Sequence, residues 1–105
     1  MEVYQQGPDY IAEEGNITLR FSKLDEHSDG YSAWLRVTTE DLPGIKNGPI
    51  FNSKILFGGP RSKKDAARAC AERVGVSEID WEGIIEGAVY RIMELIEWGE
   101  PIINL

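Results

Sequence analysis

The sequence has very little cysteine and histidine, and it lacks a long apolar run. Cys70 is the one cysteine and His27 the one histidine among 105 residues. A lone cysteine cannot form an internal disulfide, whereas small secreted domains often depend on several. No stretch of about 18 apolar residues could span a membrane, and the N-terminus lacks the basic and apolar segments of a secretory signal. We therefore expect a cytoplasmic protein with no membrane partner.

Motifs for catalysis and cofactor binding are also missing. The segment 58–64, GGPRSKK, lacks the P-loop spacing of glycines, lysine and hydroxyl. His27 lies in an acidic turn without the calcium-loop spacing, and no second histidine or cysteine completes a zinc site. No serine lies in a nucleophile elbow, and Cys70 is interpreted as a small core residue. We expect no enzyme, hence no catalytic residue, no cofactor and no metal.

What the sequence does contain is enough apolar material for a packed core. Hydrophobic residues make up 42%, including three Trp, four Tyr and three Phe. The net charge of −7 is unevenly distributed: residues 1–60 carry −4, residues 61–75 carry +3 and residues 76–105 carry −6. The total argues against indiscriminate nucleic-acid binding, while the basic segment leaves room for a local anion site.

Period-two alternation predicts the strands. Residues 1–15, with a Gly-Pro step, are predicted to be an irregular N-terminal lead. Residues 16–24 and 31–39 alternate apolar and polar side chains around a polar turn, which predicts a β-hairpin. Residues 50–57 are predicted to form a third strand. Trp34 beside Arg36 indicates that the outer face of the hairpin is also partly covered.

Period-3.6 patterning predicts two helices. The first covers residues 61–74, begins with a cap at Ser62 and stops at Gly75. The second follows a cap at Ser77 and carries a long apolar stripe. We therefore predict an α+β fold over residues 16–105: a three-stranded antiparallel sheet, the hairpin plus one strand, followed by two helices packed on one face. The apolar end, residues 101–105, indicates continuation into a further domain.

A basic cluster on the first helix is a candidate site for phosphate or DNA. It consists of Arg61, Lys63, Lys64 and Arg68. Backbone amides and the dipole at a helix start favour anions, and Gly58-Gly59 would let backbone approach a phosphate. The alternative is an ordinary solvated helix face whose charges pair with nearby acids.

The second helix carries a candidate partner surface opposite its apolar stripe. Its members are Glu82, Gly83, Glu86, Gly87, Tyr90, Glu94 and Glu97. Glycines would admit a neighbouring helix and Tyr90 would anchor it. The alternative is a solvated acidic face that contains two weak helix formers.

Residues 30–105 also resemble a known protein region. The string YSAWLRV at 31–37, the pair Asp80-Trp81 and the triplet Gly99-Glu100-Pro101 are similar to the N-terminal region of phage-type RecA-like ATPases, in the RepA and DnaB-like helicase group. The resemblance implies a domain that precedes a nucleotide-binding domain. No Walker lysine or acidic Walker strand is present here, so no ATPase residue can be assigned.

Two functions follow as expectations. The first is a non-catalytic accessory or assembly module of a DNA-processing ATPase, with a downstream ATPase domain or another protein as partner and only weak DNA contact. The alternative is a free-standing small acidic phage or bacterial protein that binds and inhibits a partner through Glu82, Glu86, Glu94 and Glu97.

Overall fold

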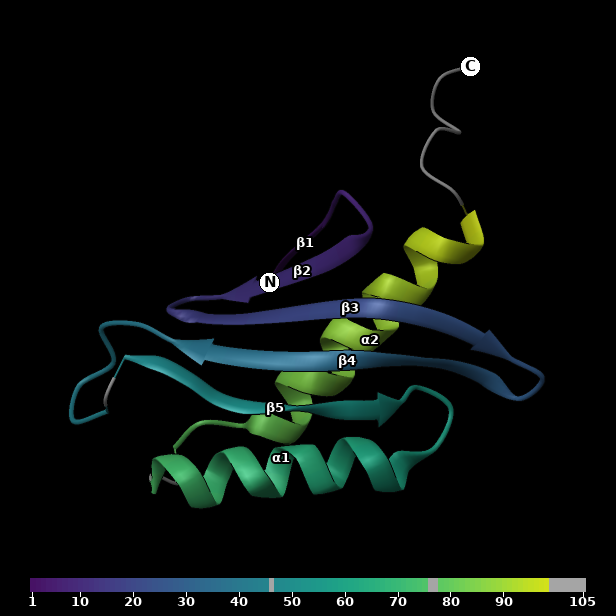
Figure 1. Ribbon diagram of the computed structural model, residues 1–105. Coiled ribbons are helices and arrows are strands. Elements are labelled where there is room, and N and C mark those ends of the chain that lie inside the picture. Colours follow the sequence, from purple (N-terminus) through teal and green to yellow (C-terminus); the bar gives the residue numbers. More distant parts are fainter. Residues whose placement is uncertain (46, 76–77, 99–105) are drawn as a thin grey trace.

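The computed structural model describes residues 1–45, 47–75 and 78–98. These residues form an antiparallel sheet and two helices, so the predicted α+β class is confirmed. The elements are β1 (Glu2–Gln6), β2 (Asp9–Glu14), β3 (Ile17–His27), β4 (Gly30–Thr39), β5 (Gly48–Leu56), α1 (Pro60–Val74) and α2 (Trp81–Trp98) (Figure 1). The predicted apolar end, residues 101–105, lies outside the described residues.

The sheet is a meander in which the strands follow the order β1-β2-β3-β4-β5. The predicted hairpin is confirmed as β3 and β4, with Phe21 opposite Leu35 and Leu19 opposite Val37. The predicted third strand is β5, which pairs with β4 along the far side of the hairpin. A β-bulge between Ser22 and Asp25 interrupts the register of β3.

The prediction of three strands is wrong, because the sheet has five. Residues 1–15, predicted to be an irregular lead, form β1 and β2, which pair from Glu2 opposite Glu13 to Gln6 opposite Asp9. Gly7, with φ of +62°, and Pro8 form the two-residue turn between them. A positive φ at the first turn position suits a hairpin, so the Gly-Pro step is a turn signal.

The core lies between the inner face of the sheet and the helices. In Figure 1, α2 crosses behind the sheet and α1 runs alongside β5. Leu19, Phe21 and Leu35 on the sheet belong to the same buried cluster as Ile85 and Ile92 of α2. The apolar stripe of the second helix therefore faces the core as predicted, and the opposite face of the sheet has no helix over it in Figure 1.

The two helices begin differently from the prediction. Helix α1 starts at Pro60, whose fixed φ suits the first helical position, and its N-cap Gly59 makes no side-chain cap. Ser62 instead accepts a hydrogen bond from the Leu56 amide at 3.0 Å. Asp80 caps α2, because its Oδ1 accepts a hydrogen bond from the Gly83 amide at 3.0 Å, whereas Ser77 lies outside the described residues. Gly75 ends α1 in the left-handed conformation, as predicted.

Candidate functional site

The outward face of α2 borders an open hollow of about 730 Å³. Five predicted partner-surface residues line it, and four more side chains come from α2, α1 and the residue after β5. The lining residues are Phe57, Lys63, Glu86, Gly87, Val89, Tyr90, Met93, Glu94 and Glu97. Val89 and Phe57 are buried, whereas Tyr90 is 67% exposed. The hollow therefore has an apolar base, an acidic rim and one prominent aromatic ring.

Glu82 and Gly83, also predicted for this surface, lie at the start of α2 and do not line the hollow. Gly83 donates its amide to the Asp80 cap, and a Cβ at this position would overlap Asp80 Oδ2. Gly87 is different, because a Cβ there would meet only the Met1 side chain, at an ordinary 3.8 Å from Cε and 4.0 Å from Sδ. The Asp80 cap thus explains why residue 83 is a glycine. No contact within the fold requires a glycine at position 87, which lines the hollow.

The four predicted basic residues of α1 do not form one patch. Lys63 points toward α2, where its Nζ is 4.0 Å from Glu86 Oε1 and its side chain is only 16% exposed. Arg61, Lys64 and Arg68 are exposed on the other side of α1. Lys64 and Arg68 border a second hollow of about 320 Å³ that also contains Glu82. Phosphate or DNA contact by these residues stays a prediction.

Gly58 has a structural role that the phosphate interpretation did not anticipate. A Cβ at Gly58 would lie 2.8 Å from the backbone oxygen of Asp29, in the turn between β3 and β4. No larger residue fits there unless the backbone moves. Gly58 therefore allows the end of β5 to approach the hairpin turn, whereas a Cβ at Gly59 would meet nothing within 4 Å.

A cationic surface that the sequence analysis missed lies on the outer face of the sheet. Outward positions of β3, β4 and β5 carry Arg20, Arg36 and Lys54, with Lys23 at the bulge and Trp34 among them. We call these five residues the basic sheet face. Trp34 is 40% exposed, so this face is partly covered, as predicted, and part of the indole still faces solvent. The sequence does contain a signal for this surface. The period-two alternation that places apolar side chains in the core also places the polar side chains between them on the outer face.

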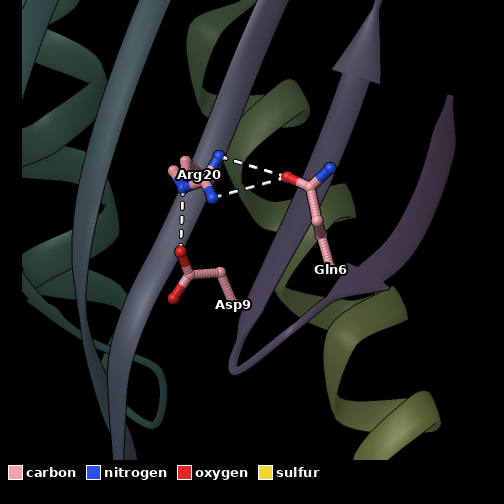
Figure 2. Close-up of polar contacts among 3 residues, drawn as sticks. All are labelled: Gln6, Asp9 and Arg20. Atoms are coloured by element: carbon pink, nitrogen blue, oxygen red, sulfur yellow. Dashed lines mark hydrogen bonds and ion pairs between the residues drawn. The ribbon is translucent and has the colours of Figure 1, made fainter.

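Acidic side chains accompany this surface on its β1–β2 side and at Asp25, which lies opposite Ser32 beyond the bulge of β3. Arg20 Nε donates to Asp9 Oδ2 at 2.9 Å, and its Nη atoms lie 3.4 Å from Gln6 Oε1 (Figure 2). The Tyr4 hydroxyl donates a hydrogen bond to Glu13 Oε2 at 3.3 Å. The pKa of Tyr4 is raised, mainly by burial and then by the negative charge of Glu13. Among the described residues, no carboxylate lies within ion-pair distance of Arg36 or Lys54. Positive charge is therefore uncompensated over β4 and β5.

His27 makes a local contact in the hairpin. Its Nε2 lies 2.8 Å from Oγ of the buried Ser32 and 3.7 Å from Asp25 Oδ2. Across residues 1–45, 47–75 and 78–98, no three His, Cys, Asp or Glu side chains gather as a metal site would require. Over the same ranges, neither helix combines the length and apolar character needed to cross a bilayer.

Comparison with known proteins gives no relative for this chain. No protein-family model, no curated protein and no solved structure matches it.

Proposed function

We propose that the chain is a non-catalytic binding module that holds a partner protein in the hollow along α2. The observation that carries the proposal is the combination of an apolar base, an acidic rim and the 67% exposed ring of Tyr90. Exposed aromatic residues beside apolar pockets are typical binding anchors. Three carboxylates, those of Glu86, Glu94 and Glu97, outnumber the single cation Lys63 at the rim. The matching partner is a polypeptide segment with apolar side chains flanked by basic ones.

The class of partner rests on the resemblance described above. The similarity of residues 30–105 to the region before RecA-like ATPase domains supports a downstream ATPase domain as the partner, with this chain as an assembly or positioning module. The acidic rim also favours the alternative of a small acidic protein that binds and inhibits another protein. Reading the source gene beyond codon 105 separates these functions. A reading frame that continues into a strand–helix unit with a P-loop motif would support the accessory module. A stop codon directly after codon 105 would exclude the form in which this domain is fused to an ATPase domain.

Docking at the hollow is tested with a Lys-rich amphipathic helical peptide as the probe. Titration is followed by amide chemical shifts in NMR spectra and by calorimetry. We expect shift changes concentrated on α2 residues 86–97 and on Phe57. Tyr90→Ala should weaken binding by about tenfold, since a typical aromatic anchor contributes 1–2 kcal/mol or more. Glu94→Gln should weaken it by a smaller factor.

A matched control is Glu72→Gln, because Glu72 is an exposed glutamate on α1 that does not line the hollow. If Glu72→Gln weakens binding as much as Glu94→Gln, or if Tyr90→Ala has no effect, the probe recognises the overall negative charge. Docking at the hollow would then be rejected.

A further inference from the structure

The register of the sheet places like charges side by side on its outer face. Arg20 lies directly opposite Arg36 on the neighbouring strand. Opposite residues in an antiparallel pair have Cβ atoms roughly 5 Å apart, and like charges there destabilise the sheet. Asp9 compensates Arg20, but Arg36 has no acidic partner among the described residues. An arrangement that costs stability without an internal gain is typical of a binding surface.

An aromatic platform lies beside these charges. Trp34 neighbours Arg36 two positions along β4 and lies opposite Lys54 of β5. Its Nε1 donates to Asn52 Oδ1, and Lys23 Nζ lies 6.0 Å from the ring centroid. The indole is therefore held in place with 40% of the residue still exposed. A fixed aromatic ring loses little conformational entropy when a flat ligand stacks on it.

From this geometry we infer that the basic sheet face binds single-stranded nucleic acid. Every base has a π-face that can stack on an indole, and stacking next to cations that follow the phosphate chain is how single strands are bound without sequence preference. Arg36 and Lys54 lie beside the ring, and Lys23 Nζ lies over it. A stacking base displaces the Lys23 ammonium from the ring face, and all three cations then supply phosphate contacts. A duplex keeps its bases stacked on one another, so it cannot use Trp34 in this way.

The charge of the rest of the chain confines the strand to this face. The total is −7, and the acidic residues of α2 lie on the helix that crosses behind the sheet (Figure 1). Phosphates are repelled from that side and attracted to the outer face of β3, β4 and β5. The site lies away from the hollow along α2, so this inference goes beyond the proposed partner docking.

The test titrates the whole chain into a fluorescein-labelled oligo-dT of about ten nucleotides at low salt, with anisotropy as the readout. Trp34→Ala should weaken binding by roughly five- to a hundredfold, whereas Trp34→Phe keeps a π-face and should retain most of the affinity. Arg36→Gln and Lys54→Gln should each weaken binding. Each should also reduce the slope of log K against log salt by about 0.7, the value for one phosphate contact on a single strand.

The matched control is the double variant Lys64→Gln/Arg68→Gln on α1, which removes two exposed cations from a different surface. Binding by this variant should equal that of the wild type. Loss of binding here, with Arg36→Gln unaffected, would move the site to α1 and overturn the inference. No binding by the wild-type chain would also overturn it.

A polyglutamate peptide separates nucleic acid from an acidic polypeptide. If it displaces the oligonucleotide at equal charge and Trp34→Ala binds like the wild type, the face recognises acidic polypeptides and the inference is wrong. The substituted side chains are exposed, so we expect each variant to keep the wild-type circular dichroism spectrum. None of these outcomes changes the result expected at the α2 hollow.

Discussion

Cys70 is the residue whose chemistry the fold changes most. It lies in α1 within the buried core, and burial raises the pKa of its thiol from 9.0 to about 12. The thiolate, which is the reactive form, is therefore scarce at neutral pH. The interpretation of Cys70 as a core residue is confirmed by its full burial.

We expect native Cys70 to react with a thiol reagent at pH 8 orders of magnitude more slowly than the denatured chain. The raised pKa also predicts a pH dependence of stability. Between about pH 9 and pH 12 the unfolded thiol ionises while the folded one stays protonated, so the free energy of unfolding falls as pH rises. The loss is at most about 1.4 kcal/mol per pH unit. Urea unfolding of the wild type and of Cys70→Ala from pH 8 to 11 isolates this contribution. If the free energy of unfolding falls with pH equally steeply in both, the prediction is wrong.

Single residues also show the limit of sequence reasoning about the surfaces. Tyr90 and its neighbouring glutamates were predicted from helical spacing alone, because i, i+4 positions share a helix face. Phe57 and Lys63 were not assigned to that surface, because α1, which carries Lys63, packs against both α2 and β5, and Phe57 follows β5 directly. Likewise, the register between β4 and β5 brings Arg36 and Lys54 close together, and this register could not be predicted from the sequence.

At the scale of elements, the strength of the local pattern decided which parts could be predicted. Strand β4 and helix α2 have clear periods of two and 3.6, and both were predicted. Strand β2 was missed because Ile11 and Ala12 are both buried and break the alternation. Ala12 faces the core, whereas Ile11 lies on the outer side opposite Tyr4 of β1. Such cover from a pairing strand cannot be read from β2 alone.

The two glycines of α2 should respond differently to alanine. Gly87→Ala should raise the free energy of unfolding by about 1 kcal/mol, because alanine is the better helix former and the new methyl group has room beside Met1. Gly83→Ala should gain less or lose stability, because its Cβ would displace the Asp80 cap. Urea denaturation measures both, and equal gains would show that the cap adapts freely. If the partner approaches Gly87 closely, Gly87→Ala should also weaken binding in the hollow.

At the scale of the whole molecule, the N-terminal hairpin connects the sheet to α2. Arg91 Nη1 donates to the backbone oxygen of Met1 at 2.7 Å, and the Met1 ammonium lies 3.4 Å from Glu14 Oε1. Met1 and Val3 also pack against the core. The first 15 residues are thus part of the folded unit, contrary to the prediction of an irregular lead.

Deleting residues 1–7 should lower the free energy of unfolding by several kcal/mol. The deletion removes β1, exposes the apolar Ile11 that lies opposite Tyr4, and leaves Arg91 without its carbonyl partner. Thermal unfolding by circular dichroism measures the change. Arg91→Ala, which removes the hydrogen bond but keeps β1, should cost about 1 kcal/mol. An unchanged melting temperature after the deletion would show that β1 contributes nothing to the stability of the fold.

The meander order has a consequence for how the chain folds. Each strand pairs with the strand next to it in sequence, so the sheet can form from short loop closures, and such low contact order favours rapid folding. The residues that cover its inner face, however, come last: Ile85 and Ile92 belong to α2. During synthesis, the hairpins can pair on the ribosome while Leu19, Phe21 and Leu35 still face water. The chain is therefore most vulnerable to aggregation in the interval between completion of β5 and emergence of α2.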